Sequence, residues 1–380
     1  MNHRERFLNT LHFQPVDHVP DQEFGYWEDT LRAWHEQGLP REIDNDHKAD
    51  LYFGFAPSAG VPVHQGLLPA FEYQVLERRG DQTLIRDVNG ATCLVHTSGQ
   101  SSIPHFLDFA LKGRPEWERD FKPRLDPDDP RRFPDPAWWD QLEQQWETRD
   151  FPVGIGIGSL YGWMRDWMGF ERAAMMTYDD PALVEEIMEQ ITRIVINTIE
   201  WAAPQVQLDY AAGWEDMCFN AGPMISPAAF ARLMVPRYRR ISDALRAHGC
   251  DIIYTDCDGN INALVPLWLE AGINGMFPVE VAGGSDPLVL RDKYGKDILL
   301  IGGVNKRALA RGKEAIEQEI ARIAPVVEQG GWIPHVDHRV PPDVTFEDYL
   351  YYLRLKRDTF GIPEPAPWEE RRPADWNPPA

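Results

Sequence analysis

The stretch CDIIYTDCDGNINALVPLWLEAGINGMFPVE, residues 250–280, holds a complete β-α-β unit. Residues 250–255 and 273–280 are short apolar runs, which are typical of buried strands. Residues 261–272, which lie between them, have the length and apolar spacing of a helix. Units of this kind predict a parallel sheet with covering helices.

The same alternation continues on both sides of this unit. Further strands are predicted at residues 151–158, 206–213, 297–304 and 331–338, and further helices at residues 179–203, 226–249, 286–295, 312–331 and 345–361. Asp180 is expected to cap the first of these helices, with Pro181 in its first turn. The helix at 226–249 is expected to be interrupted near Pro236.

These strands, with one or two more from the first part of the chain, match the count of a (β/α)8 barrel. A doubly wound sheet is the alternative, but no GxGxxG motif stands at the first βα turn. We therefore predict an α/β chain that forms a single (β/α)8 TIM barrel over residues 1–380. Residues 1–150 would be an N-terminal elaboration with the first strand, residues 151–361 the regular βα units and residues 362–380 a C-terminal tail.

The first part of the chain is rich in loops. Residues 72–96 alternate apolar and polar side chains around two turn motifs, which predicts β-hairpins or a meander. Residues 19–27, VPDQEFGYW, are expected to form a strand that leaves a loop.

The composition excludes several classes of protein and of partner. Hydrophobic residues make up 43% of the 380 residues, which indicates a globular chain. The formal net charge of -22 argues against nucleic acid or an anionic membrane as general partners. No apolar run is long enough to span a bilayer and the N-terminus lacks a signal-peptide core, so a cytoplasmic protein is expected. The four cysteines contain no CxxC pair and do not suggest a disulfide framework.

Polar side chains follow the predicted strands, where a barrel carries its chemistry. They are Ser159 and Tyr161, then Glu215 and Asp216, then Asp256, Cys257 and Asp258, then Glu280, then Asn305 and Lys306, and finally His335, Asp337 and His338. Each has a structural alternative: the aspartates could cap the helix at 261, Glu280 could cap a loop, and the histidines could be core residues. Their conjunction at successive strand ends favours a functional rim.

Two kinds of chemistry suit this rim. Clustered carboxylates raise one another's pKa, so that one can stay protonated as a general acid. The same oxygens, with His335 or His338, could hold a divalent metal such as Mg, Mn or Zn. Cys257 should point to the opposite side from both neighbouring aspartates, so we do not expect it to be the main ligand.

Several stretches resemble the uroporphyrinogen decarboxylase superfamily. They are ERFLNTLHFQPVDHVP (5–20), LYGWMRDWMGFERAAMMTYDDPALVEEIMEQIT (160–192), DYAAGWEDMCFNAGPMISPAAFARLMVPRYRRI (209–241), GGVNKRALARGKEAI (302–316) and GGWIPHVDHRVPPDVTFEDYLYYLRLKR (330–357). The resemblance covers nearly the whole chain and implies a (β/α)8 barrel with its cleft at the strand C-termini. It also implies one of two activities: cofactor-free decarboxylation of uroporphyrinogen, or methyl transfer involving a corrinoid, usually assisted by zinc.

The motifs favour the methyltransferase-like branch. The arginine-rich substrate loop of the decarboxylases is replaced by DQEFGYWEDTLRAW (21–34), although His338 and Tyr161 match decarboxylase positions. Alignment with the HxCGN zinc motif of the methyltransferases places Asp256 at the histidine and Asp258 at the first cysteine, with Glu280 near the second. All three are oxygen ligands, which do not activate a thiol as thiolate-bound zinc does.

Three hypotheses follow from the resemblance. The first is a methyltransferase or demethylase for a small O- or N-methyl compound, with a corrinoid protein as partner and a divalent metal at Asp256, Asp258 and Glu280. Its catalytic residues would be His338, His335, Glu215, Asp258 and Tyr161, and the resemblance also implies a homodimer. The second is a decarboxylase, whose cation would be Lys306, Arg307, Arg339 or Arg165. The third is a corrinoid- or metal-binding module without turnover.

Overall fold

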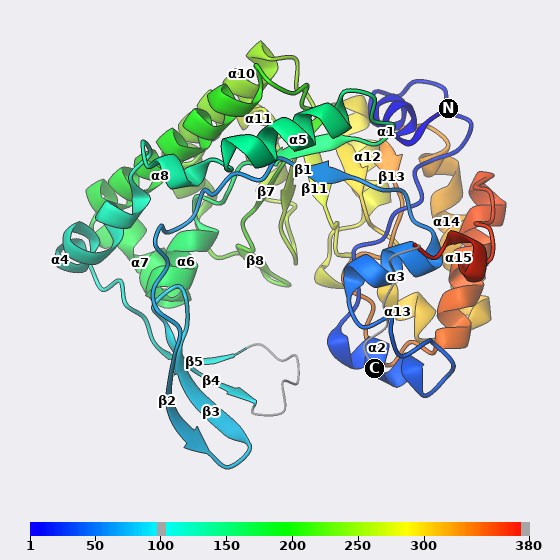
Figure 1. The fold of residues 1–380 in the computed structure, drawn as a ribbon, viewed down its shortest axis with the longest axis horizontal. Helices are drawn as coiled ribbons and strands as arrows, with labels where there is room; N and C mark the ends of the chain where they lie inside the picture. Colours follow the sequence, from blue (N-terminus) through cyan, green and yellow to red (C-terminus); the bar gives the residue numbers. More distant parts are fainter. Residues whose placement is uncertain (97–103, 374–380) are drawn as a thin grey trace.

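Seven parallel strands form one curled sheet in the computed structural model, which describes residues 1–96 and 104–373 (Figure 1). The strands are β1 (Ala59–Gly60), β6 (Val153–Gly156), β7 (Tyr210–Trp214), β10 (Ile253–Asp256), β11 (Gly275–Phe277), β12 (Leu299–Ile301) and β13 (Trp332–Ile333). They lie side by side in chain order. A doubly wound sheet would reverse direction at a switch point, so this order confirms the barrel. Residues 374–380 of the predicted tail lie outside the described residues.

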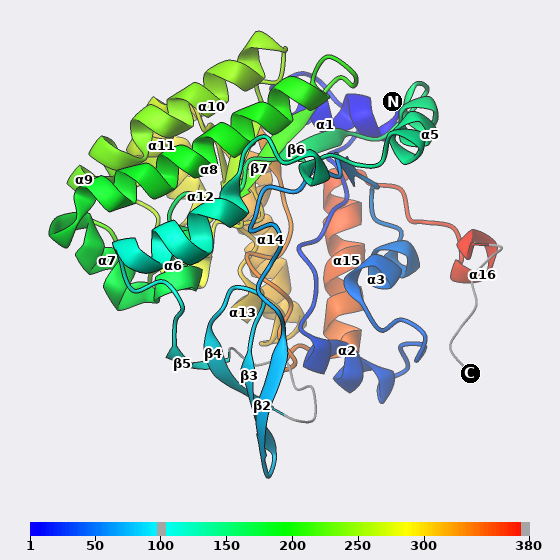
Figure 2. The same ribbon diagram turned by 60° about the vertical axis from the view of Figure 1, so that its left-hand side comes forward.

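Helices cover the outer face of the sheet (Figures 1 and 2). The helices are α1 (His3–Leu11), α2 (Glu28–His35), α3 (Asp46–Phe53), α4 (Arg114–Glu116), α5 (Pro136–Trp146), α6 (Gly162–Met168), α7 (Phe170–Asp179), α8 (Pro181–Ala202), α9 (Pro227–Leu233), α10 (Val235–Ala247), α11 (Val265–Ala271), α12 (Pro287–Tyr294), α13 (Lys306–Leu309), α14 (Lys313–Val327), α15 (Phe346–Phe360) and α16 (Trp368–Arg371). Asp180 caps α8 through the backbone N–H of Leu183, as predicted. The predicted interruption near Pro236 is confirmed, because α9 ends at Leu233 and α10 begins at Val235.

The barrel has an irregular segment where an eighth strand was expected. The predicted strand at 19–27 makes only one bridge, between Tyr26 and Val340. Gly25 has φ +125, which interrupts an extended strand. The carbonyl of Asp21 accepts a hydrogen bond from Ala56 N, just before β1, and the carboxylate of Glu23 accepts one from Val336 N, just after β13. The segment therefore links the two edges of the sheet through single contacts.

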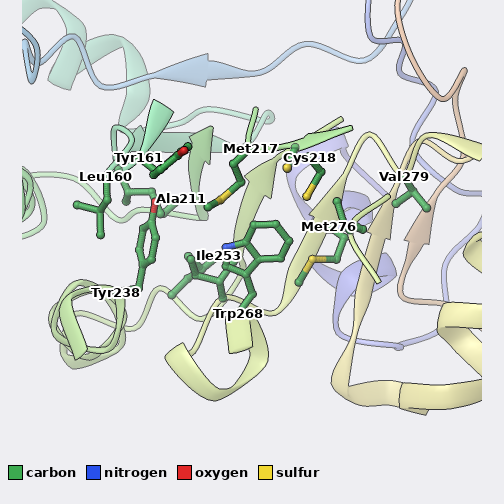
Figure 3. Close-up of a cluster of buried hydrophobic side chains, with 14 of the residues drawn as sticks. Leu160, Tyr161, Ala211, Met217, Cys218, Tyr238, Ile253, Trp268, Met276 and Val279 are labelled. Carbon is green, nitrogen blue, oxygen red and sulfur yellow. The ribbon is translucent and has the colours of Figure 1, made fainter. Parts of the chain in front are cut away.

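Two hydrophobic cores lie on the two faces of the sheet. The interior core joins Phe7 and Leu11 of α1 to strand residues such as Leu299 and Ile333, so α1 plugs one end of the barrel. The larger outer core packs the strands against the helices and includes Trp268 and Tyr238 (Figure 3). Burial of these large side chains supplies the main favourable term in folding.

The predicted meander is confirmed as an antiparallel sheet that extends away from the barrel (Figures 1 and 2). Its strands are β2 (Gln74–Arg79), β3 (Gln82–Arg86), β4 (Thr92–His96) and β5 (His105–Asp108), and a separate pair is formed by β8 (Cys218–Phe219) and β9 (Gly222–Pro223). Within residues 1–96 and 104–373, none of the helices combines the length and apolar character that a bilayer crossing requires.

Candidate active site

The carboxyl ends of the parallel strands bring the predicted polar residues to one rim. Asp256 ends β10, where it pairs in register with Trp214 of β7 and Phe277 of β11. Paired residues of neighbouring parallel strands point to the same face, so the Asp256 side chain stands between two aromatic side chains on the inner face. Asp258 follows two residues later on the loop above the strand.

Asp258 and His338 form a polar pair across the rim. Nε2 of His338 lies 3.1 Å from Oδ2 of Asp258. The imidazole stacks on Trp27, at 5.7 Å between ring centroids, and meets the edge of Phe24 at 5.5 Å. The other Asp258 oxygen, Oδ1, is buried and has no hydrogen-bond partner among the described residues. The pair therefore has a fixed imidazole and one carboxylate oxygen available to another group.

Asp256 is the most perturbed acid of the rim. Burial raises its pKa well above the usual value, and the nearby charges of Asp258 and Asp216 raise it further. Its carboxyl group makes no hydrogen bond or ion pair within the described part of the chain. Asp216 pairs with Arg165 at 3.4 Å, and its pKa is also raised, chiefly by burial. Burial and the charges of the neighbouring acids therefore both favour the protonated form of Asp256.

Glu215 has a different environment from the other acids. The buried carboxylate accepts hydrogen bonds of 2.9 Å from Ser159 Oγ and from the backbone N–H groups of Leu160, Tyr161 and Gly162. The Tyr238 hydroxyl also donates to it, and this side chain points towards the same loop (Figure 3). Glu215 thus ties the loop after β6 and the start of α6 to the strand β7. The Tyr161 hydroxyl is buried beside this loop and has no hydrogen-bond partner among the described residues.

Glu280 is held by Lys306 and by a backbone N–H group, and it does not join Asp256 and Asp258 in one cluster. Its Oε1 accepts a hydrogen bond of 2.6 Å from Nζ of Lys306, and its Oε2 accepts one of 2.9 Å from the backbone N–H of Gly259. Asp337 is buried, with its pKa raised to about 6 by burial, and accepts backbone hydrogen bonds from Val281 and Lys306. Both acids therefore hold the loops that carry the rim.

The expected metal ligands Asp256, Asp258 and Glu280 are not gathered into one coordination group. Across the described residues, no three His, Cys, Asp or Glu side chains are placed to hold a metal ion. Cys257 packs in the outer core, where its thiol lies against that of Cys218, on the face opposite to Asp256. This donor arrangement does not fit a bound zinc, so we derive no chemical step through a metal.

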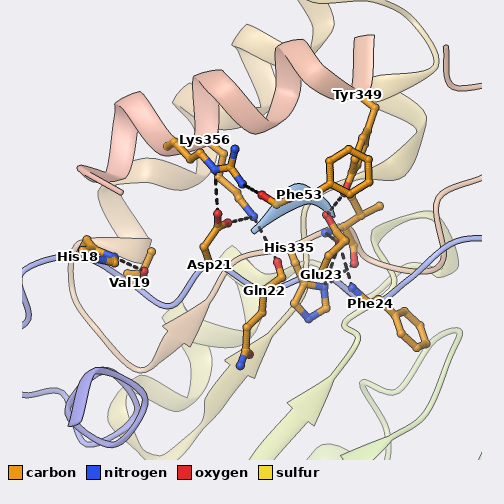
Figure 4. Close-up of polar contacts among 12 residues, drawn as sticks. His18, Val19, Asp21, Gln22, Glu23, Phe24, Phe53, His335, Tyr349 and Lys356 are labelled. Carbon is orange, nitrogen blue, oxygen red and sulfur yellow. Dashed lines mark hydrogen bonds and ion pairs between the residues drawn. The ribbon is translucent and has the colours of Figure 1, made fainter. Parts of the chain in front are cut away.

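The two histidines occupy different environments. His335 lies inside the barrel, where its Nδ1 is 2.8 Å from the carbonyl of Val336 and 3.7 Å from Glu23 (Figure 4). Burial lowers its pKa to about 3, so the imidazole is neutral. Phe277 lies beside His335, at 5.5 Å between ring centroids. His338 is therefore the histidine that the structure joins to the rim aspartates.

Three of the four cations considered for a decarboxylase are paired with acids of the chain. Arg165 contacts Asp166 and Asp216, and Arg339 contacts Asp46 at 2.7 Å. Lys306 contacts Glu280, as described above, and Arg307 is exposed. Within the described residues, Asp256 and Asp258 therefore have no salt bridge to a lysine or an arginine.

Sequence reasoning did not identify Glu23 and Asp50 as site residues. Glu23 belongs to the acidic and aromatic stretch DQEFGYW, which was the available signal. No sequence pattern marked Asp50 as a site residue. It lies in α3 and reaches the barrel only because that helix packs against it.

Comparison with known proteins agrees with this architecture. The family model for uroporphyrinogen decarboxylase (URO-D) matches residues 148–355. A curated uroporphyrinogen decarboxylase from Granulibacter bethesdensis is 26% identical over 191 residues, which cover 50% of this chain and 53% of that protein. The chain thus matches about half the length of that relative.

A solved methyltransferase from Methanosarcina mazei has the same fold. It superposes with a TM-score of 0.59 and 15% identity, over 95% of this chain and 99% of that chain. At this identity the likeness shows the fold alone. The family match covers more than half of the 380 residues and includes the strands that carry Asp256, Asp258 and His338. The chain therefore belongs to the uroporphyrinogen decarboxylase family.

Proposed function

We propose that this chain is a methyltransferase-like enzyme, which removes a methyl group from a small O- or N-methyl compound and transfers it to a corrinoid on a partner protein. The observation that carries the proposal is the rim itself. Asp256, whose pKa is raised by burial and by the neighbouring acids, lies near the Asp258–His338 pair, among aromatic side chains, while Arg165 and Arg339 are paired with acids. Aromatic walls with a few polar groups suit a small, weakly polar substrate.

The proposed step needs a proton at the group that leaves. The bond between the methyl carbon and the substrate oxygen or nitrogen would break with its electron pair left on that oxygen or nitrogen. A corrinoid in the cob(I) state on the partner protein would supply the electron pair that receives the methyl cation. Asp256 gives its proton to the departing oxygen or amine nitrogen, so that a neutral alcohol or amine is released. His338, held by Asp258 and Trp27, returns a proton from solvent to the rim.

Decarboxylation of a polycarboxylate is less compatible with this rim. A substrate with several carboxylates needs cationic partners, whereas Arg165, Arg339 and Lys306 already contact acids of the chain. The carboxylate of Asp258 would repel such a substrate. This electrostatic argument supports the methyltransferase proposal over the decarboxylase alternative.

The test is a methyl-transfer assay with free cob(I)alamin as acceptor and guaiacol or trimethylamine as donor. Formation of methylcobalamin, followed by its absorbance, is the expected result. Asp256→Asn should lower the rate with guaiacol by about 10² to 10⁴, the usual contribution of a general acid. The exposed Asp292→Asn is the matched control and should keep the rate. Failure of both donors, together with CO₂ release from a carboxylic acid that Asp256→Asn abolishes, would reject the proposal.

A further inference from the structure

A cavity of about 220 Å³ lies inside the barrel, below the rim. Tyr254, which lines it, stands two residues before Asp256 on β10 and therefore on the same inner face. Phe277, which also lines it, is the register partner of Asp256. At roughly 30 Å³ for each water, the space equals about seven water molecules. The cavity can therefore hold a small organic molecule directly beneath Asp256.

Two carboxyl groups line this cavity without a cationic partner. The side chain of Glu23 has no exposed surface, and its carboxylate accepts hydrogen bonds from the backbone N–H groups of Phe24 and Val336. The Tyr349 hydroxyl donates to its other oxygen at 3.4 Å, and the neighbouring His335 is neutral. The carboxyl group of Asp50 makes no hydrogen bond or ion pair with any residue in the described ranges. Among the described residues, neither acid therefore has a cation in direct contact, and the positive charge that acts on Glu23 is that of Lys356.

The nearest ammonium group is already engaged. Nζ of Lys356 lies 2.8 Å from Asp21 and donates to the carbonyl of Gln22 (Figure 4). Arg357 binds the other oxygen of Asp21. These contacts place the two cations behind the segment that carries Glu23, outside the lining of the cavity.

The remaining lining is mixed, with aromatic residues beside Gln22, Ser58 and Ile301. It includes Phe24, Phe55, Phe277 and the two tyrosines Tyr210 and Tyr254. Tyr254 lies within the barrel interior, and its hydroxyl has no hydrogen-bond partner among residues of the described ranges. Aromatic faces attract cations, and the Tyr254 hydroxyl belongs to a side chain that lines the cavity, where a ligand can accept or donate a hydrogen bond.

We propose that the interior cavity binds a small organic cation, namely an ammonium group that carries methyl substituents. Glu23 and Asp50 would supply the counter-charge, and the aromatic rings would contact the methyl groups. An anion would be repelled by both carboxyl groups, and a hydrocarbon would leave them and Tyr254 without partners. If this cation is also the methyl donor, its nitrogen leaves as a neutral amine and takes no proton from Asp256; that identification depends on the proposed function, whereas the binding itself does not.

The charges around the two acids predict how binding responds to pH. Burial raises the pKa of Glu23 and of Asp50 to about 7, so each is partly protonated at neutral pH. The charged or titratable groups around them are Asp21, Tyr26, Asp46, His335, Arg339, Tyr349, Tyr352, Lys356 and Arg357. A bound cation favours the ionised carboxylates, so its affinity should rise between pH 6 and 8 and protons should be released.

Calorimetry on the full chain tests the proposal with three probes. Choline and tetramethylammonium are the cations, and 3,3-dimethylbutan-1-ol is the uncharged isostere of choline. Choline should bind at least about tenfold more tightly than the isostere, as one lost charge contact of about 1.4 kcal/mol predicts. Asp50→Asn and Glu23→Gln should each weaken choline by about tenfold, whereas Asp292→Asn should not.

The outcomes separate this inference from the proposed function. Equal binding of choline and its isostere, absence of binding by both cations, or full affinity in Asp50→Asn and Glu23→Gln would overturn the cation site. Thermal unfolding monitored by circular dichroism checks that the variants fold, and Asp50→Asn changes a group with no partner to lose. Cation binding without methyl transfer to cob(I)alamin would reject the proposed reaction and leave the site standing.

Discussion

Glu215 offers the sharpest test of how the rim is built. Five donors converge on its buried carboxylate: Ser159 Oγ, Tyr238 Oη and three successive backbone N–H groups. Replacement by alanine removes every acceptor at once. The two hydroxyls can rotate towards other acceptors, but the three backbone groups of residues 160–162 cannot turn away without moving the start of α6.

The cost follows from those three backbone groups. A buried donor left without a partner costs about 1–3 kcal/mol, so Glu215→Ala should lower the free energy of unfolding by about 5 kcal/mol. That is a large share of the usual total of about 5–15 kcal/mol. Glu215→Gln can keep its oxygen at the Oε2 position and place its amide nitrogen against Leu160 N. One N–H group then loses its partner, and the expected cost is about 2 kcal/mol.

Urea unfolding, followed by tryptophan fluorescence and by circular dichroism, measures both values. Ser159→Ala is the control, because it removes one of the five hydrogen bonds and should cost about 1 kcal/mol. If Glu215→Ala unfolds at the same urea concentration as the parent chain but loses methyl transfer, the anchoring role is refuted. Glu215 would then act as a catalytic acid, which is the role that its position after a strand predicts.

Three further outcomes are expected. His338→Gln should lower kcat/KM for methyl transfer by about 10² to 10⁴ and leave the far-ultraviolet circular dichroism spectrum unchanged. A loss of the circular dichroism signal together with the loss of activity would indicate a structural role. The folded pKa of Glu23 is about 7, above its ordinary 4.5, so its stabilisation is present below pH 4.5 and is lost as pH rises through 7. Urea titrations should show a pH-dependent fall in the free energy of unfolding of the parent chain that is smaller by roughly 3 kcal/mol in Glu23→Gln. The same pH dependence in both chains would contradict the assigned protonation. Glu280 is held by Lys306 and is therefore not free to bind a metal, so chelation with EDTA should leave methyl transfer unchanged. Activity that EDTA removes and added zinc restores would reject this reasoning.

Local patterns in the chain were sufficient for the architecture. The alternation of apolar strands and amphipathic helices predicted the parallel sheet, and Asp180 and Pro236 marked a helix start and a helix break at their observed places. These signals are short in range, because side-chain periodicity and capping involve residues within a few positions of one another. The two-residue strand β1 lacked such a signal and was not located.

The partners of the polar groups could not be inferred from those patterns. The position after a strand predicted one rim for Glu215, Glu280, His335 and His338, yet the structure binds them in four different environments. A pattern of strand ends fixes which edge of the sheet a residue occupies. It does not determine whether backbone donors, a lysine or another side chain meet it there.

By itself, the sequence determined the barrel, its order of elements and the set of acids and histidines near one edge of the sheet. Only the tertiary structure decided that Asp258 meets His338, that Glu280 meets Lys306 and that Glu23 and Asp50 face a common cavity. The physical reason is distance along the chain. Asp258 and His338 are 80 positions apart, and burial of the carboxyl groups depends on helices packed from both ends of the sequence.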